Sequence, residues 1–216
     1  MSSRSTVEPV SQNASKSAEA PPPAMQLMQL ITGMWVSRCV YLAAKLGLAD
    51  QVVNGAKSPA ELAIATGTHA PSLYRLLRAL ASVGVFAEDA GGRFGLTPVA
   101  ELLRSDAPGS LRWSALSELS DTFRACWGEA MHSLQTGEIA ANKALGCDVW
   151  AYFKQHPDES EIFNRSMSGM TASIEPAVLK AYDFGGLSTL VDVWRRARDR
   201  ARGHPRGVSL PAGRRV

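Results

Sequence analysis

The stretch that decides the fold is SPAELAIATGTHAPSLYRLLRALASVG, residues 58–84. Ser58 is placed to cap a helix with Pro59 at its first position, and Glu61 completes a capping box with the serine. Gly67 ends this helix, and a second one begins near Pro71, with leucines at helical spacing (Leu73, Leu76, Leu77 and Leu80). Two short helices joined by a tight turn that contains glycine predict a helix-turn-helix.

A β-hairpin is expected directly after the second helix. Residues 85–88 and 93–96 have the composition of short strands, and Asp89-Ala90-Gly91-Gly92 supplies the turn. Thr97 is then placed to cap a further helix, with Pro98 at its first position. A helix-turn-helix followed by a hairpin is a winged helix, with the hairpin as its wing.

The segments on either side of this unit are also mainly helical. Residues 25–48 form a long helix that is apolar nearly all round, so more than one face should be buried, against a partner chain or within this chain. Residues 190–193, LVDV, read as a buried strand. The remaining helices are expected from Ser110 towards Gln135, over 147–154, after a capping Asp158, and over 175–182.

The composition is that of a globular chain, with 45% hydrophobic and 20% charged residues among 216. The three cysteines, Cys39, Cys126 and Cys147, match no metal-binding or redox spacing, which favours a reduced, cytoplasmic setting. No apolar run reaches the roughly 18 residues of a membrane span. Residues 1–24 are rich in Ser, Ala and Pro and lack the apolar region of a secretory signal, so we expect them to be disordered.

The formal net charge of +3 hides an uneven distribution. Residues 194–216 hold eight arginines and one aspartate, whereas the other 193 residues hold 15 basic and 19 acidic side chains. A winged helix invites a DNA-binding function, but a DNA-binding face is normally a cluster of basic residues. The second helix offers Arg75 and Arg78 and the wing offers Arg93, but the other basic residues between 25 and 110 are scattered singly and form no cluster. A DNA-binding transcriptional regulator is therefore the alternative hypothesis, and we expect no nucleic-acid partner.

Few residues suggest chemistry by themselves. Phe163, Met167 and Met170 share one face of a helix, which is typical of core packing. His132 and His156 have no partners at the spacing of a metal site or a nucleophilic triad. We therefore assign no catalytic residue and no metal ligand.

The order of these elements resembles a known family. A long helix and a winged helix are followed by Trp150-x-x-Phe153-x-x-His156-Pro157, by FNxxM at residues 163–167 and by GxSTLVDV at 186–193. Together they resemble the S-adenosylmethionine-dependent O-methyltransferases of the caffeate, acetylserotonin and hydroxyneurosporene type. The resemblance implies that the winged helix dimerises, that the next helices wall the acceptor pocket, and that a Rossmann-like domain binds the methyl donor and carries a histidine base.

The resemblance also implies roles for particular residues. Phe163, Met167 and Met170 would line the pocket of a small-molecule acceptor. Met167, Thr171 and Asp192 would lie at the S-adenosylmethionine site, with Thr171 near the donor carboxylate and Asp192 on the first Rossmann strand. The implied partner is a second copy of the chain in a homodimer, or an intact paralogue in a heterodimer, and no membrane is involved.

The resemblance stops after Val193. The family continues with VDVGGGxG, whose glycines let the backbone approach the cofactor at a helix N-terminus, but this chain has Trp194-Arg195-Arg196 there. Read one base out of step, the codons of residues 194–216 are compatible with a sequence that begins GGGHGT. We therefore hypothesise a frameshift after codon 193, and we expect residues 194–216 to be disordered.

The predicted fold is thus mainly α. It comprises a disordered segment 1–24, a winged-helix dimerisation domain with a small β-hairpin wing over 25–110, connecting helices over 111–186, the truncated start of a Rossmann-like α/β domain over 187–193, and the tail 194–216. The expected reaction is methyl transfer from S-adenosylmethionine to a hydroxyl of a small molecule. Because the glycine turn and the histidine base are missing from this sequence, we expect the chain to be inactive alone and to lack a preformed donor site.

Overall fold

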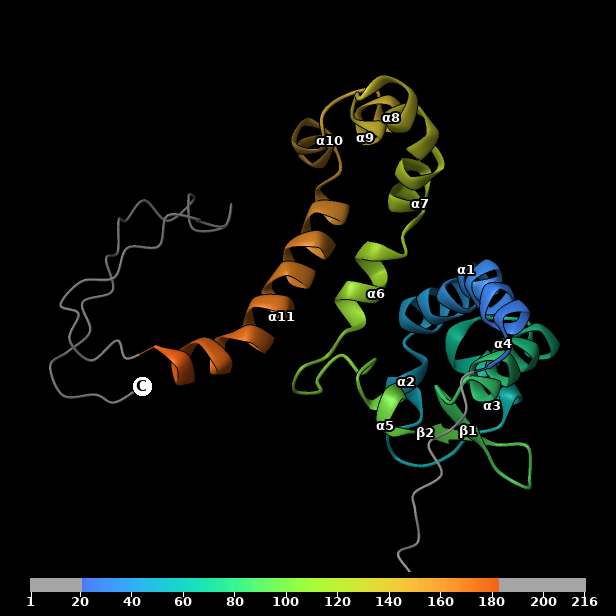
Figure 1. The fold of residues 1–216 in the computed structure, drawn as a ribbon. Helices are drawn as coiled ribbons and strands as arrows, with labels where there is room; N and C mark the ends of the chain where they lie inside the picture. Colours follow the sequence, from blue (N-terminus) through green and yellow to red (C-terminus); the bar gives the residue numbers. More distant parts are fainter. Residues whose placement is uncertain (1–20, 183–216) are drawn as a thin grey trace, which may run out of the picture. The chain divides into compact units, whose positions relative to one another are not determined.

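A computed structural model describes residues 21–182, which are mainly helical with one two-stranded antiparallel sheet (Figure 1). The predicted mainly α composition is confirmed. Residues up to Met34 and residues from Trp35 onward form separate units, and each is described by itself. The expectations for residues 1–20, for the LVDV strand and for residues 194–216 lie outside the described range. Residues 23 and 24, which we expected to be disordered, belong to the first helix. The elements are α1 Pro23–Leu46, α2 Leu48–Gln51, α3 Pro59–Thr66, α4 Ala70–Ser82, β1 Phe86–Glu88, β2 Phe94–Leu96, α5 Pro98–Glu101, α6 Arg112–Glu118, α7 Asp121–Gly128, α8 Ala130–Thr136, α9 Ala140–Leu145, α10 Val149–Gln155 and α11 Pro157–Ala181.

The helix α1 has two halves of different character. By length and composition alone it is apolar enough to cross a membrane. Its second half carries Arg38 and Lys45, however, and buries Tyr41, Ala43 and Ala44 in the protein interior. Its first half exposes a row of large apolar side chains, namely Met25, Leu27, Met28, Leu30, Ile31 and Met34. Within its own unit this first half buries none of these side chains.

The core of the second unit forms where the second half of α1, α2–α5 and the hairpin meet. The largest fully buried apolar side chains are Leu48, Leu62, Leu77, Leu80, Phe86 and Phe94. Burying each such side chain is worth about 1.5–3 kcal/mol, so this cluster is the main source of stability in the domain. The leucines of α4 that reach it follow the predicted helical spacing.

The local signals of the helix-turn-helix act as predicted. Ser58 Oγ accepts a hydrogen bond from the backbone N–H of Glu61 at 3.3 Å, and Glu61 Oε2 accepts one from the backbone N–H of Ser58 at 2.7 Å. Gly67 ends α3 with a φ of 65°, a left-handed conformation that favours glycine. The helix α4 begins at Ala70, one residue before the predicted Pro71.

The hairpin is also present, with each strand one residue shorter at its start than predicted. The strands β1 and β2 pair antiparallel. Asp89 Oδ1 closes the turn by accepting hydrogen bonds from the backbone N–H groups of Gly91 and Arg93, both at 2.9 Å. Thr97 caps α5 as predicted, since its hydroxyl accepts a hydrogen bond from the N–H of Ala100.

Residues 112–136 form three helices, so the prediction of a single helix here was wrong. The helix α6 ends at Glu118, and Ser120 then caps α7 by accepting a hydrogen bond from the N–H of Phe123 at 3.1 Å. Glu129 separates α7 from α8. A serine hydroxyl can accept a hydrogen bond from a nearby backbone N–H group in place of a backbone carbonyl. This favours the start of a new helix at Ser120 over continuation of α6.

Residues 157–181, by contrast, form the single helix α11 where two helices were predicted. Asp158 is not its cap, because His156 precedes the helix and Asp158 already lies in the first turn. Pro176 lies inside α11 without ending it, although a proline lacks the backbone donor and its ring crowds the carbonyl of the preceding turn. The helix α11 packs along α6 and α10, and this packing forms one wall of the site described next.

Candidate functional site

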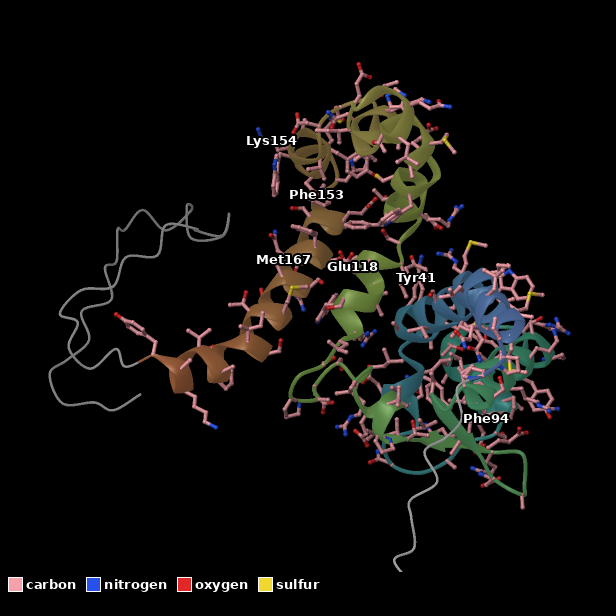
Figure 2. All side chains as sticks on the ribbon, viewed as in Figure 1. Tyr41, Phe94, Glu118, Phe153, Lys154 and Met167 are labelled. Carbon is pink, nitrogen blue, oxygen red and sulfur yellow. The ribbon has the colours of Figure 1, made fainter. Side chains whose placement is uncertain are left out.

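The described residues to which the resemblance assigns a site role all lie on α11. Phe163 and Met167 are half-buried and one turn apart, whereas Met170 and Thr171 are exposed (Figure 2, where Met167 is labelled). The hydroxyl of Thr171 donates a hydrogen bond to the carbonyl of Met167 at 2.9 Å. Asp192 lies outside the described residues. The structure therefore separates a half-buried pair from an exposed pair.

Phe163 belongs to an aromatic cluster that joins α10 to α11. Its ring centroid is 5.0 Å from that of Phe153 and 6.4 Å from that of Trp150. Ring pairs at such distances stabilise by about 0.5–1.5 kcal/mol beyond the burial of their area. The WxxFxxHP and FNxxM motifs, which are separate in the sequence, thus meet through their aromatic residues.

A cavity of about 390 Å³ lies beside this cluster. Its lining comes from α1, α6, α7, α10 and α11, and its apolar wall includes Phe123, Phe153, Ile162 and Phe163. Small-molecule sites are typically about 300–1,000 Å³ and mostly apolar, with a few polar groups that orient the ligand. Of the three predicted acceptor residues, Phe163 lines this cavity, and Met167 and Met170 do not.

A hydrogen-bonded network of Thr122, Tyr152 and Glu159 lies at the cavity. Glu159 accepts hydrogen bonds from the Thr122 hydroxyl at 2.6 Å and from the Tyr152 hydroxyl at 3.0 Å. The hydrogen bond with Thr122 acts to lower the pKa of Tyr152, but burial and the contact with Glu159 outweigh it and raise that pKa. The ring of His156 stacks on Tyr152 with centroids 3.9 Å apart. Tyr152 is therefore held as a neutral donor to the carboxylate.

Two other charged residues line the cavity, and their surroundings differ. Asp121 is paired with Arg38 at 3.0 Å and with Arg124 at 3.5 Å. Lys45 Nζ lies 3.4 Å from the hydroxyl of Tyr41 and 5.5 Å from the centroid of its ring. Within residues 21–182, no carboxylate lies within ion-pair distance of Lys45.

Sequence reasoning missed Tyr41, Lys45, Thr122 and Glu159. Glu159 lies four residues before Phe163 and so shares its helix face, a spacing that could have pointed to it. Tyr41 and Lys45 carry no comparable signal, because their neighbours in the cavity lie far away along the chain.

A second and larger hollow, of about 520 Å³, lies on α8 and α9. Its lining includes His132 and Glu138, whose Nε2 and Oε2 atoms are 3.0 Å apart. It contains no residue to which the resemblance assigns a role, so the cavity beside Phe163 is the candidate site. No group of three metal-ligating side chains occurs in the described part of the chain, and all three cysteines are free thiols.

The arginines considered for DNA binding make contacts inside the domain. Arg78 is 3.7 Å from Glu88 and lies over the ring of Tyr74. Arg93 pairs with Glu61 at 3.2 Å. Arg75 donates to the hydroxyl of Ser72. Each of the three arginines therefore has a partner within the chain.

Comparison with known proteins places the chain among methyltransferases. Residues 28–106 match the family described as the O-methyltransferase dimerisation domain. Phenazine O-methyltransferase PhzM of Lysobacter antibioticus is 44% identical over 176 residues, which are 82% of this chain and 51% of that protein. The chain thus spans about half the length of the curated relatives that it matches. A DNA-binding function is not supported by these matches.

Solved structures give the same result. The crystal structure of LaPhzM has a TM-score of 0.73 at 44% identity and covers 76% of this chain and 49% of its own. The O-methyltransferase NcsB1 from neocarzinostatin biosynthesis, in complex with S-adenosylmethionine and 2-hydroxy-5-methyl naphthoic acid, has a TM-score of 0.58 at 34% identity. It covers 70% of this chain and 47% of its own. Residues 28–106 are therefore an O-methyltransferase dimerisation domain, and the chain is a relative of the O-methyltransferases that carry this domain.

Proposed function

We propose that this chain supplies the dimerisation domain and the acceptor-binding wall of an S-adenosylmethionine-dependent O-methyltransferase that acts on a hydroxyl of a small aromatic molecule. The observation that carries the proposal is the cavity beside Phe163, which has the size and the aromatic wall of a site for a planar ring. Its lining combines α1, which belongs to the domain that matches the family, with helices that follow this domain in the sequence. The known ligand of NcsB1, a naphthoic acid, is a molecule of this kind.

Within this function α3, α4 and the β1–β2 hairpin act as a winged helix that serves dimerisation. The first half of α1 supplies the contact surface, since Leu30 is 79% exposed and stands in a row of exposed apolar side chains. Apolar patches of this kind commonly mark protein–protein contacts. The partner is a second copy of the chain, or an intact paralogue, in the cytoplasm.

The methyl donor needs residues beyond the described part of the chain. Of the residues to which the resemblance assigns a donor role, Met167 and Thr171 lie on α11, and the Thr171 hydroxyl donates to a backbone carbonyl. These two residues by themselves do not form a site for S-adenosylmethionine. We therefore propose that the chain alone binds an acceptor without methylating it.

Ligand binding to the full chain tests the proposal. A fluorescent aromatic hydroxy acid, 3-hydroxy-2-naphthoate, is titrated into the wild type and into Phe163→Ala. Loss of the Phe163 ring should weaken binding by about tenfold, since an aromatic contact of this size is worth on the order of 1 kcal/mol or more.

Leu134→Ala is the matched control, because Leu134 is 80% exposed on α8 and lies outside the cavity. It should bind like the wild type. Absence of binding to the wild type, or an equal loss in both variants, would contradict the proposed acceptor site.

A further inference from the structure

We infer that Lys45 recognises a carboxylate on the aromatic acceptor, so that the acceptors of this site are aromatic hydroxy acids rather than neutral phenols. The inference rests on the proposed function and names the substrate class of the same cavity. It follows from the position of the ammonium group, from the charges around it and from the shape of the apolar wall.

The ammonium group of Lys45 is held at the α1 side of the cavity. Lys45 lies in the last turn of α1, and its Nζ donates to the hydroxyl of Tyr41 at 3.4 Å. Tyr41 is itself buried and is labelled in Figure 2 on α1, so it offers the lysine a fixed partner. The C-terminal end of a helix interacts favourably with a cation at this place.

Among the described residues, Lys45 is the one cationic side chain that lines the cavity. Asp121 is neutralised by Arg38 at 3.0 Å. Glu159 accepts two hydroxyl hydrogen bonds, from Thr122 and Tyr152. Among residues 21–182, no carboxylate pairs with Lys45. A ligand carboxylate at Lys45 therefore gains a charge-assisted hydrogen bond without breaking an existing ion pair.

The apolar wall determines which kind of anion fits. Phe153 and Phe163 lie 5.0 Å apart with their ring planes tilted by 31°, next to Phe123 and Ile162. A wall of this kind excludes a strongly hydrated inorganic anion and favours a planar aromatic ring. An aromatic acid satisfies both the ring wall and the ammonium group, whereas a neutral ring satisfies the wall alone.

Two aromatic probes of nearly the same shape, one with a carboxylate and one with a neutral amide, test the effect of the ligand's charge. The full chain is titrated with 3-hydroxy-2-naphthoate and with the neutral 3-hydroxy-2-naphthamide, using probe fluorescence. The variants are Lys45→Met, which removes the charge at similar length, and Lys45→Arg, which keeps it. Lys154→Met is the matched control, because Lys154 is an exposed lysine on α10 that does not line the cavity (Figure 2).

The wild type should bind the naphthoate about tenfold more tightly than the naphthamide, and added salt should reduce this preference. Lys45→Met should abolish the preference, and a circular dichroism spectrum and urea midpoint equal to those of the wild type show that the variant is folded. Lys45→Arg and Lys154→Met should keep the preference.

Failure of the inference can be distinguished from failure of the proposed function. If the wild type shows no preference, or Lys45→Met keeps it, while Phe163→Ala weakens both probes, the role of Lys45 is refuted and the acceptor site stands. If neither probe binds to the wild type, the acceptor site and the role of Lys45 are both refuted.

Discussion

Replacing Arg112 with methionine should destabilise the chain more than replacing any exposed arginine. Arg112 begins α6 and donates from Nη1 to Asp50 Oδ2 at 2.7 Å and from Nε to the carbonyl of Ala44 at 3.1 Å. The side chains of Arg112 and Asp50 are only 19% and 28% exposed. This contact ties the end of α1 and the start of α2 to α6, the helix that packs on α11.

The magnitude follows from what the substitution removes. A hydrogen bond to a charged group contributes about 1.5–3 kcal/mol, and breaking a fully buried ion pair costs about 3–5 kcal/mol. Asp50 keeps its bonds from the backbone N–H and the hydroxyl of Ser105, and it retains some contact with water. We therefore expect Arg112→Met to lower the free energy of unfolding by about 3 kcal/mol.

Urea denaturation followed by circular dichroism measures this change. With a slope of about 2 kcal/mol per molar, the midpoint should fall by roughly 1.5 M. Arg124→Met is the control, because Arg124 is 64% exposed in a 3.5 Å pair with Asp121 and should lose less than about 1 kcal/mol. In combination with Asp50→Asn, the two losses should be non-additive by about 1 kcal/mol or more.

Two results would contradict this expectation. Arg112→Met could prove no more destabilising than Arg124→Met, or the losses in free energy of unfolding from the Arg112 and Asp50 variants could prove strictly additive. Either result would mean that water replaces the guanidinium at this junction without loss.

Further predictions concern the dimer, the capping box and the methyl donor. Leu30→Glu should convert a dimer into a monomer in size-exclusion chromatography with light scattering, while Leu134→Glu, at a similarly exposed position on α8 outside the matched domain, should not. Hydrogen bonds from the Ser58 hydroxyl and backbone lower the pKa of Glu61 below its ordinary value of 4.5, so the stability from Glu61 is complete above that pH and is lost as the pH falls through the lowered pKa. Glu61→Gln should therefore flatten the loss of stability in acid, as measured by urea midpoints from pH 6 to pH 3. Isothermal titration should show no micromolar binding of S-adenosylmethionine to this chain, and micromolar binding would contradict the absence of a preformed donor site. Deletion of one base near codon 194 should open a methyltransferase reading frame of more than about 100 codons, and absence of such a frame would contradict the frameshift.

The local structure of residues 58–84 could be predicted from the sequence because each capping or turn signal acts within a few residues. Ser58 and Glu61 are three positions apart, and Gly67 adopts its left-handed conformation wherever a helix ends on it. The same reasoning failed where an element depends on its neighbours. Ser120 starts a new helix within residues that the pattern assigned to one longer helix. The helix α11 continues through Pro176, where the sequence predicted two separate helices.

The sequence by itself determined the mainly α composition, the capped helix-turn-helix with its hairpin, and the order of motifs that identified the family. These features depend on spacings of a few residues, which can be recognised in the sequence before the fold is known. Only the tertiary structure decided that Phe163 shares a cavity with Lys45, and that Arg112 reaches Asp50. Their partners come from helices far apart in the sequence, and packing of the apolar faces, rather than any local preference, brings those helices together.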